Sequence, residues 1–89
     1  MVRESHRVSI RTKYLGPTNY RGSRVRVWRG DSSYRDDPNS LEIGWDYSSE
    51  VSENHSAAVS AYVGRAGWDG QWMCGATESG CVAVWVGDR

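Results

Sequence analysis

Residues 41–66 read LEIGWDYSSEVSENHSAAVSAYVGRA, and the spacing of their apolar side chains changes once along this stretch. As far as Tyr47 every second residue is apolar, which is the period of a strand that buries one face. Beyond it the period lengthens to that of a helix, and one stripe comprises Val51, His55, Ala58, Val59 and Tyr62, continued by Val63 and Ala66. The stretch therefore predicts a strand followed by a helix.

The predicted helix has recognisable boundaries at both ends. Ser48 or Ser49 is expected to cap its first turn, because a hydroxyl oxygen can accept the N–H groups left free there. Glu50 and Glu53 lie where the positive end of the helix dipole favours acids. Gly67 is expected to end the helix, since glycine adopts the left-handed conformation of a C-terminal cap without strain.

Strand periodicity recurs in the rest of the chain and indicates the fold class. Residues 7–14 and 24–28 alternate between apolar and polar, and the polar residues 30–39 predict a surface loop. Residues 72–76 and 81–86 predict a terminal hairpin. The order is then β-β-β-α-β-β, an α+β fold with one helix packed on one face of an antiparallel sheet. We expect residues 1–89 to form a single small domain.

Charge is balanced overall but divided along the chain. Lys plus Arg and Asp plus Glu both number 11, so the formal net charge is zero, which disfavours a globally basic nucleic-acid binder and an acidic DNA mimic. Basic residues are in excess up to Ser40 and acidic residues from Leu41 onward. Because no apolar run approaches the ~20 residues that cross a bilayer and the N-terminus lacks a signal-peptide stretch, we expect a soluble cytoplasmic protein.

Much of the basic charge lies on the first two predicted strands. It forms a basic ribbon, which we define as Arg7, Arg11, Lys13, Arg24 and Arg26, flanked by Arg21 and Arg29. The cations of such a ribbon can bind phosphates, and Tyr20 and Trp28 can stack on bases. The competing interpretation is that Glu42 and Asp46 pair with Arg24 and Arg26 across strands and neutralise about half of it.

The segment TKYLGPTNYRGSRV, residues 12–25, resembles the opening of a group of small phage and prophage proteins whose pattern is TKYLGPTN-x-RGSR. The similarity continues at Trp45-Asp46-Tyr47, at Glu53-Asn54-His55 with Ala57-Ala58, and at Gly67-Trp68, and it spans nearly the whole chain. The loop of residues 30–39 and the Trp-rich end depart from that group. The resemblance implies a mobile-element gene acting in a bacterial cytoplasm, and it supplies no catalytic residue.

The polar segment within this motif has two alternative interpretations. Asn19 and Gly22 can take left-handed backbone conformations, and Thr18 or Asn19 can bond nearby amides, which would make a self-satisfied turn. In the alternative, the segment is a presented loop in which Arg21 and Arg24 offer paired donors to a carboxylate or phosphate.

The sequence contains no recognisable catalytic or metal-ligand grouping. Glu53 and His55 are two residues apart on the helix and point to different sides, and the apolar stripe is a typical place for a packing histidine. Cys74 and Cys81 have only His6 and His55 as further candidate ligands, at no recognised zinc spacing. We therefore expect no catalytic residue, no metal and no cofactor.

The two cysteines flank the turn of the terminal hairpin. A symmetric turn over residues 77–80 places Cys74 opposite Ala83 and Ala76 opposite Cys81, so that the sulfur atoms are offset and we expect two free thiols. The same hairpin has one apolar face, formed by Val82, Val84 and Val86.

Tryptophan, tyrosine and arginine dominate binding hot spots, and this chain has five Trp and five Tyr. We therefore hypothesise a non-enzymatic phage or mobile-element accessory protein that acts by protein–protein binding to a host or defence-system protein. Its most concrete form is an anti-CRISPR-like or anti-restriction inhibitor of a bacterial defence system.

The alternative hypothesis is a small nucleic-acid-binding module that uses the basic ribbon. A second copy of the chain is a further candidate partner, because the terminal hairpin has no proline and few charges to block its edge. The candidate binding residues are Arg7, Arg11, Lys13, Asn19, Tyr20, Arg21, Arg24, Arg26 and Trp28.

Overall fold

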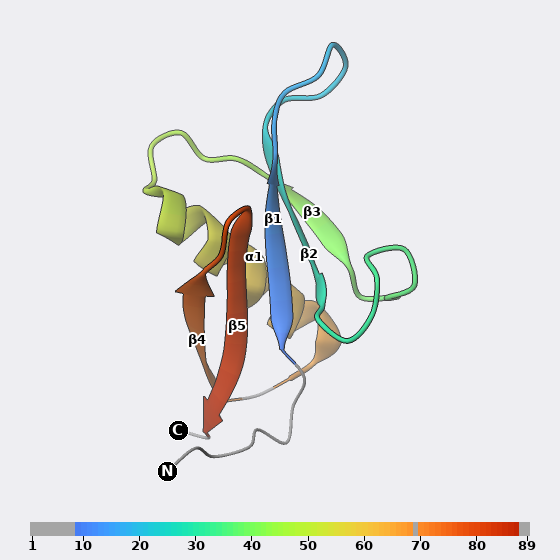
Figure 1. Ribbon diagram of the computed structural model, residues 1–89, viewed down its shortest axis with the longest axis vertical. Helices are drawn as coiled ribbons and strands as arrows, with labels where there is room; N and C mark the ends of the chain where they lie inside the picture. The colour runs from blue at the N-terminus through green and yellow to red at the C-terminus, as the bar shows by residue number, and fades with distance from the viewer. Residues whose placement is uncertain (1–8, 69, 88–89) are drawn as a thin grey trace.

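The computed structural model describes residues 9–68 and 70–87, which form a five-stranded antiparallel sheet with one helix packed on one face (Figure 1). In chain order the elements are β1 (Ile10–Leu15), β2 (Arg24–Arg29), β3 (Leu41–Gly44), α1 (Val51–Ala66), β4 (Gln71–Ala76) and β5 (Gly80–Gly87). The predicted α+β class and the order β-β-β-α-β-β are confirmed.

The first described strand lies at the centre of the sheet, whose order is β3-β2-β1-β5-β4. Thr12 of β1 faces Val27 on one side and Cys81, 69 residues away in sequence, on the other. α1 connects the edge strands β3 and β4 and crosses behind the sheet in Figure 1. β1 therefore pairs with β2 on one side and β5 on the other, and so joins the hairpin β1–β2 to the hairpin β4–β5.

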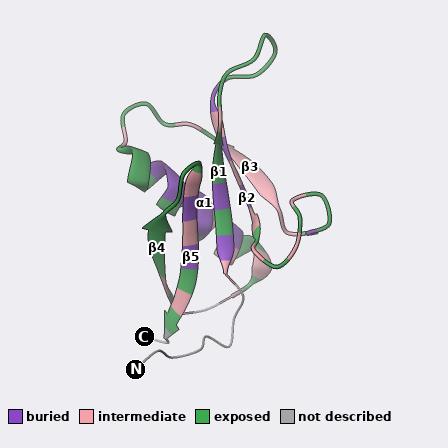
Figure 2. Cartoon of the chain, viewed as in Figure 1, coloured by how far each residue is buried: buried purple, intermediate pink, exposed green. Residues whose placement is uncertain are grey.

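The core lies between α1 and the middle of the sheet, shown in purple in Figure 2. Alternation along β1, β2 and β5 points every second side chain at the helix, which removes these side chains from water. The buried apolar residues are Ile10, Val25, Val27, Cys81 and Ala83 from the sheet, and Ala58, Val59 and Tyr62 from the helix.

The start of the helix differs from the prediction. Glu50 is the N-cap residue, and the Glu53 carboxylate accepts the N–H of Glu50 at 3.0 Å. The hydroxyls of Ser48 and Ser49 instead donate to the carboxylate of Asp46. The predicted serine cap is therefore wrong, because a charged acceptor two or three residues upstream engages both hydroxyls.

The helix ends where the sequence predicts, but the first residue of the predicted apolar stripe is not buried. Gly67 closes α1 in the left-handed conformation, with φ 72°. Val51 is 63% exposed, although it begins the predicted stripe, and Asn54 is buried in its place. The Asn54 amide accepts the N–H of Asp46 at 2.8 Å and donates to the Asp46 carbonyl at 3.0 Å. With the Asn54 amide bonded to the backbone of Asp46, the first turn of α1 directs Asn54 inward and Val51 outward.

β3 is shorter than the predicted strand. It ends at Gly44, whereas the alternation in the sequence continues to Tyr47. Past the strand, the N–H of Trp45 donates to the carbonyl of Ser23 at 3.0 Å, and the chain then leaves the sheet toward α1. The last part of the alternation instead belongs to Trp45, whose ring contacts that of Tyr14 on β1, and to the exposed Tyr47, whose hydroxyl contacts the Oγ of Ser23.

β5 approaches β1 very closely at its first residue. A Cβ atom on Gly80 would overlap the carbonyl group of Thr12, whereas a Cβ on Gly75 in β4 would meet no atom nearer than 4.0 Å. Glycine at position 80 is therefore a requirement of the β1–β5 pairing.

We expect Gly80→Ala to lower the free energy of unfolding by about 1–3 kcal/mol, because a methyl group forced against backbone must displace a strand. Gly75→Ala is the matched control and should change it by less than about 1 kcal/mol. Urea denaturation of both variants measures the difference. Equal effects at the two positions would contradict the close approach.

The polar loop of residues 30–39 lies on the surface but contains one buried anchor. Asp37 is only 6% exposed, and its Oδ2 accepts the Tyr62 hydroxyl at 2.6 Å and the N–H of Arg29 at 2.8 Å. Burial raises the pKa of Asp37, but the hydrogen bonds from Tyr62, Asn39 and Arg29 lower it further than burial raises it. The net pKa is therefore below its ordinary value, and the carboxylate fastens the loop to α1.

The sign of this pKa shift predicts a pH dependence. The stabilisation by Asp37 is complete above the pKa of the unfolded chain, about 3.9, and is lost as the pH falls through the lower folded value. We expect Asp37→Asn to reduce the free energy of unfolding at neutral pH by about 1.5–3 kcal/mol and to flatten its fall in acid. Urea denaturation from about pH 3 to pH 7 tests both; an unchanged acid limb in the variant would rule the role out.

Candidate functional site

A groove of about 1510 Å³ runs between α1 and the β4–β5 hairpin. It exists because α1 packs mainly over β1 and β2 and leaves β4 uncovered, as the exposed colour of β4 in Figure 2 shows. Ser52, Ser56 and Ser60 line the helix wall at every fourth residue, and Trp72 and Cys74 line the opposite wall. The Oγ of Ser56 lies 3.9 Å from the Sγ of Cys74, so the two walls meet at this level.

One end of the groove rests on a buried polar cluster. The Oγ1 of Thr12 accepts the N–H of Cys81 at 2.9 Å and lies 2.7 Å from Nδ1 of His55 and 3.2 Å from Sγ of Cys81. Burial lowers the pKa of His55. Burial, together with the nearby Cys74 thiol, raises the pKa of Cys81. Both pKa shifts favour the uncharged forms of these groups at neutral pH. The hydrogen bonds of the Thr12 hydroxyl connect β1 to β5 and to α1.

Aromatic side chains stand around the same end of the groove. The rings of Tyr14 and Trp45 meet edge to face with centroids 4.8 Å apart, and the Trp45 and His55 ring centroids are 5.9 Å apart. The hydroxyls of Tyr14 and Tyr47 both contact the Oγ of Ser23, at 2.9 and 3.1 Å. Tyr14 is 41% exposed and Tyr47 is 78% exposed. This end is therefore a half-open aromatic corner held by hydrogen bonds.

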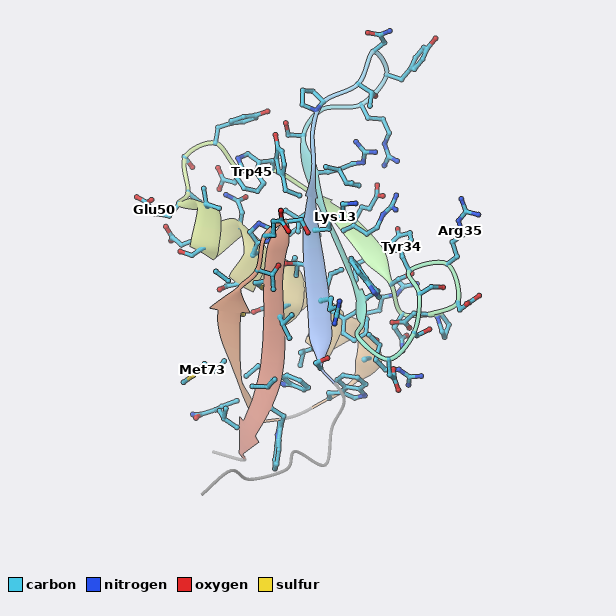
Figure 3. The ribbon with its side chains drawn as sticks, in the orientation of Figure 1. Lys13, Tyr34, Arg35, Trp45, Glu50 and Met73 are labelled. Carbon is cyan, nitrogen blue, oxygen red and sulfur yellow. The ribbon has the colours of Figure 1, made fainter. Side chains whose placement is uncertain are left out.

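Three stretches singled out in the sequence, residues 12–25, 45–47 and 53–55, converge at this corner. Residues 12–25 supply Thr12 and Tyr14, residues 45–47 supply Trp45, and residues 53–55 supply His55. Figure 3 shows the labelled Trp45 beside the start of α1, where Glu50 is also labelled. Stretches far apart in the sequence thus build one end of one groove.

The rim of the groove is acidic. Glu50 and Glu78 line it, and its lining within the described residues includes no lysine or arginine. A bound segment with a cationic side chain would therefore meet opposite charge at the rim.

The four described members of the basic ribbon, Arg11, Lys13, Arg24 and Arg26, share one face of the sheet, and Glu42 pairs with two of them. Lys13 faces Arg26 across the β1–β2 pair, and Arg26 in turn faces Glu42 on β3. The Glu42 carboxylate bonds Arg24 Nε at 3.0 Å, Arg26 Nη2 at 2.8 Å and Arg21 Nη2 at 3.1 Å. Burial raises the pKa of Glu42, but the arginines lower it more. Arg21 and Arg24, which one interpretation gave as donors for a bound carboxylate or phosphate, are therefore paired with a carboxylate of the chain itself.

The predicted role of Asp46 in this pairing is wrong. Its carboxylate accepts the N–H and hydroxyl of Ser48 and the hydroxyl of Ser49, and these bonds lower the pKa of Asp46. Because β3 ends at Gly44, Asp46 lies in the turn before α1 and does not face the arginines.

The other predicted binding residues are scattered over the β1–β2 half of the molecule. Arg11 and Lys13 are exposed and form no ion pair within the described residues, whereas Arg29 pairs with Asp31 at 2.6 Å. Trp28 packs edge to face on Tyr34, with ring centroids 6.4 Å apart. Arg7 lies outside the described residues.

The segment before β2 is the self-satisfied turn. The Oγ1 of Thr18 accepts the N–H groups of Tyr20 and Arg21, at 3.2 and 3.0 Å, as one of the two interpretations predicts. Asn19 and Gly22 do not adopt left-handed conformations; in the described residues a positive φ occurs only at Gly67 and Gly70. Tyr20 is 95% exposed at the tip of this loop, and Asn19 is exposed beside it.

The terminal hairpin has the predicted register. Cys74 faces Ala83 and Ala76 faces Cys81, and both cysteines are free thiols. The valine face of β5 turns away from the helix, where Val84 and Val86 remain 43% and 51% exposed. The small residues Cys81 and Ala83 form its core face instead, which leaves room for the helix.

No groove residue belongs to the predicted binding set. The available signal was the repeat of serines at positions 52, 56 and 60, which indicates a small, polar helix wall, but a polar helix face is ordinarily solvated. The described residues contain no group of three or more side chains that could hold a metal ion, and no helix among them is long and apolar enough to cross a membrane. Comparisons with protein-family models, curated proteins and solved structures found no match for this chain.

The Glu42 contacts predict that the basic ribbon binds DNA more tightly when the Glu42 charge is removed. We expect Glu42→Gln to leave three guanidinium groups without a carboxylate and to raise affinity for duplex DNA at low salt by about fivefold or more. Fluorescence anisotropy at two salt concentrations measures this, with Asp31→Asn as a control that frees only Arg29. Wild-type protein that already binds as tightly as the variant would contradict neutralisation by Glu42.

Proposed function

We propose that this protein is a non-enzymatic binding protein whose groove between α1 and the β4–β5 hairpin receives a segment of a partner protein. The observation that carries the proposal is the groove itself, a large open channel with an aromatic corner at one end and an acidic rim. A groove can desolvate the side chains placed in it, and the residues that dominate binding energy lie in well-packed, desolvated pockets.

The aromatic corner is the expected anchor point for the partner. Tyr14 and Trp45 present ring faces and edges that are already held in place by Ser23 and His55. A side chain that packs there loses little entropy from the groove, because these rings do not need to be ordered on binding. An apolar or aromatic side chain of the partner is therefore the best fit to this end.

The rim indicates the charge of the same segment. Glu50 and Glu78 face it without a cationic lining residue among those described, so lysine or arginine flanking the apolar anchor would gain favourable contacts. The partner segment is therefore apolar in its centre and basic at its flanks.

The biological setting that we propose is a phage or other mobile element in a bacterial cell. Its support is the resemblance of residues 12–25 and the later motifs to small phage and prophage proteins. In its most concrete form, the partner is a host or defence-system protein and the chain inhibits that system. In this form the chain would act by occupying a partner's surface, which requires no catalytic residue.

Nucleic-acid binding by the basic ribbon is the weaker candidate. Glu42 already occupies Arg21, Arg24 and Arg26, which leaves Arg11 and Lys13 as the ribbon cations without an ion pair among the described residues. Few free cations give weak contact with phosphates, with only a shallow salt dependence.

The groove can be tested with two neighbouring substitutions on α1. Ser56→Arg places a long side chain in the groove, and Ala57→Arg places the same side chain on an exposed position that does not line it. Arginine is a good helix former, so neither substitution should unfold α1. Tagged wild type and both variants are used to capture partners from nuclease-treated bacterial lysate, and the purified partner is then titrated against each.

The proposal requires one protein that wild type and Ala57→Arg bind equally and that Ser56→Arg binds at least about tenfold more weakly. Restoration of phage plaquing on a defended host should follow the same order. A partner that Ser56→Arg binds as well as wild type would exclude the groove. Partners that disappear with nuclease treatment and depend on Arg11 and Lys13 would favour the nucleic-acid alternative.

A further inference from the structure

β4 is an edge strand without the usual protection. Its residues 71–76, QWMCGA, contain no charge and no proline, and its edge is unpaired within the described residues. The opposite edge, β3, is shorter and carries Glu42 with its ion pairs. Exposed, uncharged edges are the places where another strand adds most readily.

The hairpin register determines which backbone groups of β4 face outward. The N–H of Thr77 donates to the carbonyl of Gly80 at 2.9 Å, which makes this a hydrogen-bonded pair. Because hydrogen-bonded and non-hydrogen-bonded pairs alternate in an antiparallel ladder, Trp72, Cys74 and Ala76 turn their N–H and carbonyl groups away from β5. A sixth strand would bond to these residues.

The outward-facing strand is complementary to itself about Cys74. An antiparallel second copy with its two-fold axis at this residue pairs Cys74 with Cys74, and Trp72 with Ala76. On the other face it pairs Met73 with Gly75. Large side chains thus face small ones, and each outward-facing residue exchanges both of its backbone hydrogen bonds. No like charges meet, because β4 carries none.

We propose that two copies of this chain associate through their β4 strands, antiparallel and centred on Cys74, to form one continuous sheet. The inference goes beyond the proposed binding function and stands on the β4 edge alone. Because α1 lies over β1 and β2, the two helices would stand at opposite sides of the joined β5–β4 hairpins. The open side of each groove would then become part of one trough with two helical walls.

The register can be tested by crosslinking single thiols. In Cys81→Ala protein the remaining thiol is Cys74, and at a hydrogen-bonded pair two copies bring the Cα atoms to about 5.5 Å, within disulfide range. Diamide takes one hydrogen from each thiol and is reduced to its hydrazine, which leaves an intermolecular disulfide. We expect a covalent dimer on non-reducing gels at micromolar protein concentrations.

The matched control moves the thiol along the same edge. In Cys81→Ala/Cys74→Ser/Ala76→Cys protein the two thiols belong to positions offset by four residues, about 14 Å apart in the proposed pairing. This variant should yield at least about tenfold less covalent dimer than Cys81→Ala. Equal yields would show random collision and would overturn the register.

Association itself is tested by sedimentation equilibrium of wild type in reducing buffer. Ala76→Pro removes an N–H that points away from β5, so the hairpin keeps its ladder, and the dimer should dissociate at least about tenfold more readily. Ala57→Arg, at an exposed position of α1 that does not line the groove, should leave the dimer intact. Wild type that remains monomeric up to about 100 µM would overturn the proposal without affecting the groove test.

Discussion

The hydroxyl group of Thr12 joins the three elements on which the groove depends. From the central strand it reaches Cys81 on β5 and His55 on α1, residues that are 69 and 43 positions away in sequence. Because this group is buried, its loss would leave a backbone N–H and an imidazole nitrogen without partners, which costs more than an ordinary surface bond. The position of α1 relative to β5, and hence the shape of the groove, rests on this contact.

Opposite charges in this protein are paired within the sheet and its loops. The excess of basic residues in the first half of the chain and the excess of acids in the second meet at the β2–β3 pair, where Glu42 contacts three arginines. Asp37 performs a similar task in the loop of residues 30–39, since it satisfies backbone N–H groups and the Tyr62 hydroxyl together. These carboxylates stabilise connections between elements, whereas the open groove lies beside α1 and β4.

The groove and the β4 edge share one cause. α1 covers the half of the sheet that contains β1 and β2, because the large buried side chains Ile10, Val25 and Val27 are there and share one core with Tyr62 of the helix. The buried residues of the β4–β5 half are the small Cys81 and Ala83, and apart from the partly buried Trp72 the residues of β4 remain exposed. An uncovered strand at the edge of a sheet presents both a side-chain surface and a row of backbone groups, so one asymmetry of packing leaves both the groove and the β4 edge open.

The sequence by itself determined the fold class, the order of elements, the register of the terminal hairpin and the cap at Gly67, because each follows from local spacing or from one glycine's conformational freedom. It left the choice between a free and a neutralised basic ribbon open, and it misplaced Asp46, Val51 and the N-cap. Only the tertiary structure decided these points, together with the central place of β1 and the groove. Their common reason is that strand order and helix placement depend on contacts such as Thr12 with Cys81, which no local pattern records.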